Sequence, residues 1–463
     1  MCDKIAFKEV KHMILKRKIY NRLLEWKKES GKRALLIEGA RRIGKSTIVE
    51  EFAKNEYKSY ILIDFNHVSK LVLDAFENHA SRLDDFFLIL SMEYGRTLYR
   101  RESLIIFDEV QKYPHARELI KYLVADGRYD YIETGSLISI HENVKDITIP
   151  SEERRLAMYP LDFEEFCWAM GNDQLPEYLR QCFAEQLPPS GEIHKMAMFL
   201  FRQYMLVGGM PMSIIAYLEG QKSFAASDAE KRDILQLYRE DIRKIDRKYQ
   251  ARVQSIFDQL PSFLSQHEKR VKISNIDPNG KAVQYEESFF WLADSMICNE
   301  CFNCSDPQVG LALNEERSFI KCYMGDTGLL VSHAFVENEI TENELYKNIL
   351  YDRLNLNEGM LYENMIAQML SANGHKLYFY THYSEEKHRN DIEIDFIITN
   401  RSRLKEKIYP IEVKSSKRYS TVSLDRFNER FSGRIAGSYV IHPKEFRAEG
   451  SRVYLPAYMT FCL

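Results

Sequence analysis

Short apolar runs alternate with longer segments of mixed polarity over residues 1–165. The runs are ALLIE, YILIDF, LIIFDE and YDYIETG, at residues 34–38, 60–65, 104–109 and 129–135. Uninterrupted apolar runs separated by segments of helical length are typical of parallel strands buried between helices. A further run, RLAMYPL at 155–161, could close the same sheet. The pattern therefore predicts an α/β domain with a parallel sheet over residues 1–165.

The pattern changes twice beyond this domain. Apolar residues recur at mostly helical spacing over residues 166–249, interrupted by VGGMP at 207–211, which predicts a helical linker or lid region. Short helices and then alternating strands follow over residues 250–335. A charged stretch, 336–359, marks a boundary, and strands and helices alternate again in an α/β pattern over residues 345–463. We therefore expect a four-part chain.

Composition narrows the function only a little. The 463 residues include 64 basic and 68 acidic side chains, so the net charge is −4 and no overall basic field attracts nucleic acid. A nucleic-acid site would have to be a local patch. No apolar run is long enough to span a membrane, and the first residues lack the apolar core of a signal peptide. With its eight cysteines scattered, we expect a cytoplasmic protein without membrane contact.

The sequence GARRIGKS at residues 39–46 matches the phosphate-binding pattern GxxxxGK[ST] in full. Glycines let the loop backbone turn its N–H groups toward phosphate oxygens, and a helix start adds favourable dipole charge. We expect Lys45 to reach the β- and γ-phosphates and the Ser46 hydroxyl to bind Mg²⁺. The predicted ATP-binding residues are Gly39, Ala40, Arg41, Arg42, Ile43, Gly44, Lys45, Ser46 and Thr47.

A second motif, LIIFDE, places Asp108 and Glu109 at the end of an apolar run. An aspartate there holds Mg²⁺ in P-loop enzymes, and an adjacent glutamate can activate the attacking water as a general base. The run YILIDF lies between the two motifs in the chain, as expected when another strand intervenes. Thr134 and Ser136 end the next run and could contact the γ-phosphate or orient the water, a strand-end turn being the alternative. Together the motifs predict ATP hydrolysis.

The order of motifs along the chain resembles that of prokaryotic AAA+ ATPases that carry a C-terminal domain of unknown function. The resemblance rests on GARRIGKS, LIIFDEVQKYP, IETGS, YPLDFEEF, VGGMP, KCYMGDTGLL, LYENMIAQML, EIDFII and IEVKSS, which cover almost the whole chain. It implies a signalling-type ATPase with a winged-helix-like region at 250–335, a regulatory or defence-related role, and a protein partner or homo-oligomer. Relatives often have a Gly-Arg pair where this chain has Arg154 and Arg155, which are candidates for an arginine finger or a solvated pair.

The last region has its own group of charged residues. Asp395 lies in EIDFII, and Glu412 and Lys414 lie in IEVKS, where alternate strand residues share a face. If the two runs form a hairpin, Asp395 falls opposite Glu412. Glu363, on the preceding predicted helix, could approach the same place. Two or three carboxylates would then lie beside an amine.

This arrangement resembles the restriction-endonuclease-like PD-(D/E)xK fold, with Ile394 in place of the proline before Asp395. The resemblance implies a second divalent ion held by Asp395, Glu412 and Glu363, with Lys414 as a catalytic residue that stabilises developing negative charge. Nucleic acid would then be the substrate. A retired nuclease fold that persists as a scaffold is the alternative.

Three functions stay open at this point. The chain could be a Mg²⁺-ATPase whose hydrolysis repositions the C-terminal domain, an ATP-regulated nuclease acting on DNA or RNA, or a non-catalytic ATP-binding module. The candidate recognition helix of the winged-helix-like region carries Glu286 and Glu287, which phosphates would repel, so protein packing is favoured there. The CxxCxxC run at 298–304 has only three local thiols and is expected to be structural.

Overall fold

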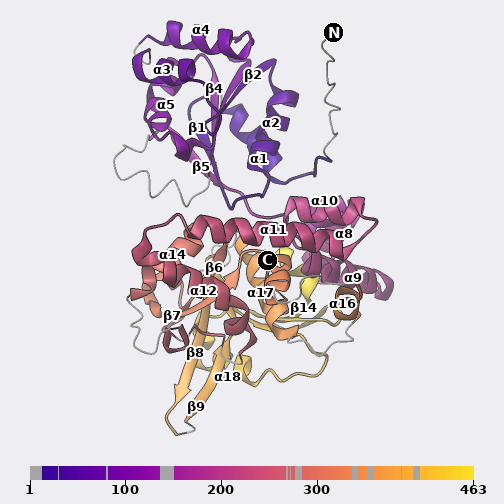
Figure 1. The fold of residues 1–463 in the computed structure, drawn as a ribbon. Coiled ribbons are helices and arrows are strands. Elements are labelled where there is room, and N and C mark those ends of the chain that lie inside the picture. Colours follow the sequence, from indigo (N-terminus) through magenta and orange to yellow (C-terminus); the bar gives the residue numbers. More distant parts are fainter. Residues whose placement is uncertain are drawn as a thin grey trace.

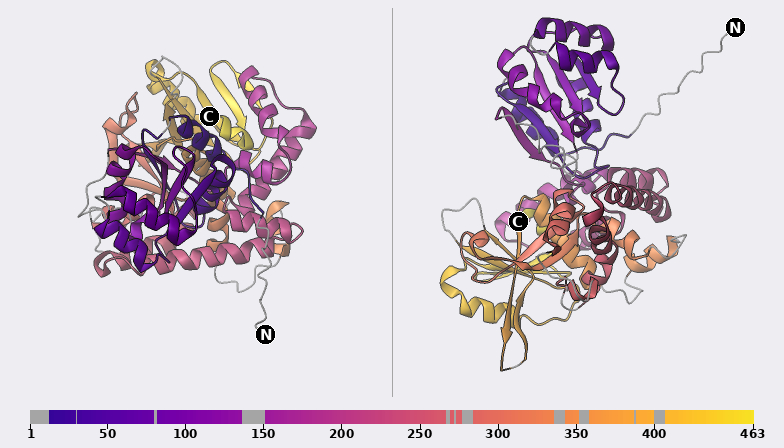
Figure 2. Two further views of the ribbon diagram at one scale, coloured as in Figure 1. Left: turned by 90° about the horizontal axis from the view of Figure 1, so that it is seen from above. Right: turned by 60° about the vertical axis from the view of Figure 1, so that its left-hand side comes forward.

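The fold was examined in a computed structural model. It describes residues 13–29, 31–79, 82–135, 151–266, 269–271, 273–276, 284–335, 343–351, 358–386, 388–399 and 407–463. Two bodies are visible in Figure 1: an N-terminal α/β domain and a larger body built from the rest of the chain. The second view in Figure 2 shows the same division, with the N-terminal domain standing on one side of the larger body. Within the described residues no helix is long and apolar enough to cross a membrane.

The N-terminal domain contains the predicted parallel sheet. Its strands are β1 (Ala34–Glu38), β2 (Ser59–Asp64), β3 (Ser103–Asp108), β4 (Asp130–Gly135) and β5 (Glu153–Ala157). They lie in the order β2-β3-β4-β1-β5 with every pair parallel. The run YILIDF forms β2 at the edge of the sheet, so it is β4 that separates the two motif strands in space. The intervening strand expected from the sequence was therefore the wrong one, because chain order does not fix lateral order.

Helices cover both faces of this sheet because alternate strand residues point to opposite sides. Leu35 and Ile37 pack with α1 (Ile19–Lys28) and α2 (Lys45–Glu56). Ala34 and Leu36 belong to the opposite core, with three helices. Those helices are α3 (Lys70–Asn78), α4 (Leu83–Tyr94) and α5 (His115–Asp126). The continuous apolar runs read from the sequence are thus strands buried on both faces.

The middle of the chain is helical, as its periodicity predicts. It contains α7 (Phe163–Ala169), α8 (Gln174–Glu185), α9 (Gly191–Val207), α10 (Pro211–Glu219), α11 (Phe224–Ile242) and α12 (Arg247–Ser265). A capping box in which Asp162 and Glu165 exchange side-chain and backbone hydrogen bonds starts α7. In Figure 1, α10 and α11 lie along the top of the larger body, facing the N-terminal domain.

One sheet crosses the boundary that the sequence suggested near residue 336. Strands β6 (Cys298–Cys304) and β7 (Glu315–Met324) pair with β8 (Leu377–Ser384) and β9 (Arg389–Ile394) in the order β7-β6-β8-β9. The regions 250–335 and 345–463, expected to be separate, therefore share a sheet. The hairpin of β6 and β7 is not a free wing, since β6 lies between β7 and β8 and its three cysteines are buried.

A second sheet completes the larger body. Its strands are β10 (Phe396–Thr399), β11 (Ile408–Val413), β12 (Ser438–His442), β14 (Arg452–Pro456) and β13 (Arg447–Glu449), in that order. The remaining helices of the body include α14 (Glu286–Asp294), α15 (Thr327–Ala334), α16 (Asn343–Leu350), α17 (Glu358–Ala372) and α18 (Val422–Arg430). The α17 helix is buried along almost its whole length and carries Glu363 into the interior.

Candidate functional site

The phosphate-binding loop lies between β1 and α2. Gly44 precedes the helix with φ of 89°, a left-handed conformation that glycine adopts without steric cost. A Cβ atom on Gly39 would lie 2.4 Å from the carbonyl oxygen of Met158, so only glycine fits where β5 leads out beside the loop. Ala40 and Ile43 are buried, whereas Arg41, Arg42 and Thr47 are exposed. Backbone geometry thus favours glycine at both Gly39 and Gly44.

Lys45 lies across the mouth of this loop. Its ammonium donates to the carbonyl oxygens of Gly39 at 3.0 Å and Ala40 at 2.9 Å. Burial lowers the pKa of Lys45 to about 8, against the opposing influence of Glu109 and Asp108. No carboxylate in the described part of the chain forms an ion pair with it. A buried cation held only by carbonyl dipoles is suited to receive an anionic ligand such as a phosphate.

Three strand and helix ends meet at Asp108. The Ser46 hydroxyl donates to Asp108 Oδ1 at 2.6 Å, and the buried Thr134 hydroxyl at the end of β4 donates to the same oxygen. A hydroxyl and a carboxylate are oxygen ligands that suit Mg²⁺, so these two residues fit the ion that the motif implies. Thr134 contacts this carboxylate rather than pointing freely into the site. Ser136 lies outside the described residues.

Glu109 follows directly after β3 with a left-handed backbone, φ 56°. That conformation turns its side chain away from the strand axis, and Gln111 donates a hydrogen bond to its carboxylate. The backbone N–H of Glu109 lies 3.4 Å from the Thr134 hydroxyl. A non-glycine residue in this conformation is uncommon and is often found where a functional side chain must be aimed. Glu109 is half-buried and directly follows Asp108 in the chain.

The larger body contacts the loop directly. Arg41 forms an ion pair with Asp241 near the end of α11, with nitrogen–oxygen distances of 2.8 and 3.0 Å. Tyr238 of the same helix donates to the Arg41 carbonyl at 3.4 Å. A Cβ on Gly44 would lie 3.6 Å from the ring of Pro211, the first residue of α10. Tyr238 and Asp241 could not be predicted from the sequence, because they lie about 200 residues from the loop without a motif of their own.

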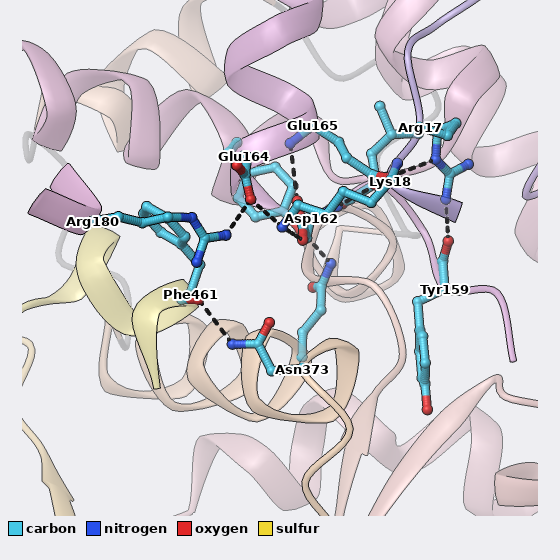
Figure 3. A network of polar contacts seen from close by, with 12 residues as sticks. Arg17, Lys18, Tyr159, Asp162, Glu164, Glu165, Arg180, Asn373 and Phe461 are labelled. Carbon is cyan, nitrogen blue, oxygen red and sulfur yellow. Dashed lines mark hydrogen bonds and ion pairs between the residues drawn. The ribbon is translucent and has the colours of Figure 1, made fainter. Parts of the chain in front are cut away.

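Arg17 ties the back of the loop to the larger body, as Figure 3 shows. Its guanidinium donates to the carbonyl oxygens of Ile43 at 2.9 Å and Tyr159 at 2.6 Å, and it pairs with Glu165 at 3.2 Å. Lys18 pairs with Asp162 at the start of α7. The arginine is buried and lies 26 residues before the loop residue that it holds, so no local pattern predicts its role.

The polar contacts continue from α7 into α17. The Leu161 N–H donates to the Gly209 carbonyl at 2.7 Å, and the Gly209 N–H donates to Asp326 at 2.6 Å. Gln368 of α17 donates to Tyr204 at 3.0 Å, and Tyr204 donates to the Leu161 carbonyl at 2.7 Å. The motifs YPLDFEEF, VGGMP, KCYMGDTGLL and LYENMIAQML, distant in sequence, therefore meet in one buried network behind the nucleotide site.

The arginines of β5 form ion pairs within the N-terminal domain. Arg154 lies 2.5 Å from Glu29, and Arg155 lies 3.5 Å from both Glu38 and Glu153. Both side chains are directed to neighbouring carboxylates instead of the Ser46 and Asp108 pair.

The C-terminal charged residues divide into two groups. Antiparallel pairing of Phe396 with Ile411 brings Asp395 opposite Glu412 at the next step of the register, as the hairpin prediction requires. The Asp395 carboxylate accepts a hydrogen bond from the Val413 N–H at 2.7 Å. Glu412 instead pairs with Lys414 at 2.6 Å, and burial raises its pKa. Lys414 thus neutralises Glu412 through Oε1 only, and the Oε2 atom of Glu412 is buried without a hydrogen-bond partner among the described residues.

Glu363 and Asp395 surround a different amine. Lys321 of β7 lies 3.3 Å from Glu363 and 3.9 Å from Asp395, and Lys269 also pairs with Glu363. Among the residues with described side chains, no three His, Cys, Asp or Glu side chains are grouped to hold a metal ion. The ion site expected from Asp395, Glu412 and Glu363 is therefore not assembled, because lysines neutralise these carboxylates. No pattern in the sequence predicted that Lys321 would lie beside these carboxylates.

Comparison with known proteins agrees with the N-terminal geometry. Residues 31–167 match an AAA domain family. Residues 198–339 and 358–459 match two families described as domains of unknown function, DUF8612 and DUF4143. No curated protein matches the chain. The N-terminal domain is thus an ATP-binding P-loop ATPase domain of the AAA type.

Two solved structures are similar over most of their own length. A Walker-type ATPase of Pyrococcus abyssi is 17% identical with a TM-score of 0.39, covering 69% of this chain and 96% of its own. Cdc6p from Pyrobaculum aerophilum is 12% identical with a TM-score of 0.27, covering 74% of this chain and 97% of its own.

Proposed function

We propose that this protein hydrolyses Mg²⁺-ATP at the loop of residues 39–46 and passes the nucleotide state to its larger body, in a regulatory role. One observation carries the proposal: Arg41, a residue of the phosphate-binding loop, is bonded to Asp241 of α11. A ligand that binds the Arg41 guanidinium must weaken or break its ion pair with Asp241. The ATPase domain and the rest of the chain are therefore linked at a residue of the phosphate-binding loop itself.

The hydrolytic chemistry follows from the positions of five side chains. Lys45 would leave its two carbonyl acceptors and bind the β- and γ-phosphates, where its positive charge is neutralised. Ser46 and Asp108 would hold Mg²⁺, which supplies charge neutralisation at the phosphates. Glu109 would accept a proton from the attacking water, and Thr134 fixes the orientation of the Asp108 carboxylate.

Coupling to the larger body uses both sides of the loop. On the exposed side, Arg41 would exchange Asp241 for a phosphate oxygen, which weakens the hold of the loop on α11. On the buried side, Arg17 keeps the Ile43 carbonyl fixed relative to Tyr159. The Arg41–Asp241 contact would change while the Arg17–Ile43 contact stays in place. A small movement at the nucleotide would then become a rotation of one body against the other.

A nuclease regulated by ATP is less well supported by the described contacts. Cleavage of nucleic acid by this fold requires carboxylates free to bind a divalent ion. Here Glu363 and Glu412 are each paired with lysine. The C-terminal region is accordingly proposed as the part that responds to the nucleotide, with a protein or a second copy of the chain as its partner.

The test of hydrolysis is the variant Glu109→Gln, assayed on the full chain. It keeps the shape of the side chain but removes the base, so kcat should fall by about 10²–10⁴-fold. ATP affinity, measured by calorimetry, should stay within about threefold, since the phosphates are held by other residues. Glu118→Gln on α5 is the matched control and should leave both quantities unchanged. Hydrolysis by Glu109→Gln at the wild-type rate would reject Glu109 as the base, and binding without turnover in the wild type would favour a non-catalytic module.

A further inference from the structure

Lys321 sits where three elements of the larger body converge. Its Nζ atom lies 3.3 Å from Glu363 on α17, 3.7 Å from Glu393 on β9 and 3.9 Å from Asp395 in the turn between β9 and β10. The lysine side chain is only 2% exposed. A single ammonium thus faces one carboxylate from α17 and two from residues 393–395.

The charges of this cluster nearly cancel. Lys269 adds a second ammonium on Glu363, and the Tyr323 hydroxyl donates to the same carboxylate. Burial alone would lower the pKa of Lys321, but Glu363, Asp395 and Glu393 together raise it above its usual range. The Lys321 side chain is therefore held in place by ion pairs with the carboxylates around it.

A metal ion and this ammonium would compete for the same oxygens. Divalent Mg²⁺ or Mn²⁺ binds carboxylate oxygens at roughly 2.0–2.3 Å and needs several of them converging on one point. The carboxylates of Glu363, Glu393 and Asp395 converge instead on Nζ, at the longer spacing of an ion pair. An ion could enter only if the lysine side chain left, and that side chain is enclosed by the sheet and α17.

We propose that the Lys321 ammonium replaces a divalent cation, so that the C-terminal region contains a latent metal site that is closed in this protein. The ligand class of the opened site is a hard divalent cation held by the carboxylates of Glu363, Glu393 and Asp395. The site as it stands works without metal and serves to join β7, α17 and the turn after β9. This inference concerns the larger body alone and does not depend on ATP hydrolysis by the N-terminal domain.

The test is Mn²⁺ binding by the full chain without nucleotide, followed by electron paramagnetic resonance of free Mn²⁺. Lys321→Ala removes the ammonium and leaves room, so it should bind about one more Mn²⁺ per chain than the wild type. Lys321→Arg keeps a cation and should bind no extra ion. Adding Glu363→Gln to Lys321→Ala should remove the extra ion. A folded Lys321→Ala protein with no extra Mn²⁺ would overturn the proposal.

A second measurement compares Mn²⁺ binding by the wild type and Glu363→Gln and does not require the Lys321→Ala variant. The wild type and Glu363→Gln should bind the same amount of Mn²⁺, because the native cluster holds none. Mn²⁺ bound by the wild type and lost in Glu363→Gln would show that the metal displaces the lysine, and the proposal would be wrong. This comparison decides the question even if Lys321→Ala does not fold.

Discussion

Two buried lysines, Lys45 and Lys321, show how differently the two bodies use the same side chain. Lys45 has only carbonyl oxygens as hydrogen-bond acceptors, and burial lowers its pKa to about 8. Lys321 is enclosed by three carboxylates, which raise its pKa above the usual range despite burial. The difference teaches that burial alone does not make a lysine functional. Lys45, whose hydrogen-bond acceptors are loop carbonyls, is ready for an anionic ligand, whereas Lys321 already has carboxylate partners.

The largest expected effect comes from replacing each lysine by methionine, which keeps length and removes charge. Lys321→Met removes the ammonium that Glu393 and Asp395 face, while Glu363 keeps Lys269, and should destabilise the larger body by about 3–5 kcal/mol, lowering its thermal midpoint by roughly 10 °C. Lys45→Met removes a buried charge that has no ion-pair partner, so the midpoint should move by no more than about 3 °C. Differential scanning calorimetry of both variants measures this contrast.

The same pair separates stability from binding. Lys45→Met should weaken ATP binding by at least about 100-fold, because the phosphates lose their buried cation. Lys321→Met should bind ATP like the wild type wherever it remains folded. If Lys45→Met and Lys321→Met lost the same stability, Lys45 could not be distinguished from Lys321 as a ligand-binding lysine, and the comparison would be wrong.

A smaller effect concerns pH. Below pH 8, Lys45 is protonated in both the free and the ATP-bound protein, so its charge gives no pH dependence of affinity. Above pH 8 the free protein loses this proton, whereas bound phosphate favours the charged form, so binding must take up a proton. Affinity should then fall by up to about tenfold per pH unit until the pKa of the complex is reached.

Calorimetry between pH 8 and 10, in two buffers of different ionisation enthalpy, measures both the affinity and the proton uptake. The number of protons taken up should rise toward one as the pH increases above 8. A flat affinity with no proton uptake would show that Lys45 keeps an ordinary pKa, and its contrast with Lys321 would lose its electrostatic basis.

The strand, loop and helix around residues 39–46 could be predicted from the sequence because their determinants are local. A buried strand, a glycine loop and a helix follow one another within residues 34–56, and Asp108 and Glu109 end a single apolar run. Any chain that forms this loop needs glycine where the backbone is left-handed or approaches another strand closely. For the same reason the strands of the parallel sheet and the helical middle region were predicted correctly as elements.

The rest could not be read from local patterns because it depends on pairing between distant segments. The parallel pairing of β6 with β8 joins Cys301 to Leu377 across α17, which no periodicity specifies. Likewise, Asp241 contacts the loop only once the two bodies meet, and Arg17 lies 26 residues before the loop residue that it holds. The hairpin register of Asp395 was predictable from the alternation of two adjacent runs, but the lysine that accompanies it comes from β7.

The central claim is that nucleotide at the loop alters the contact between the two bodies at α11. Hydrogen exchange of the full-length Glu109→Gln protein, with and without Mg²⁺-ATP, tests it most directly. We predict faster exchange near Tyr238 and Asp241 when ATP is bound, with α18 unchanged as an internal control and no difference in a protein that also carries Lys45→Ala. Identical exchange of α11 with and without bound ATP would contradict the account.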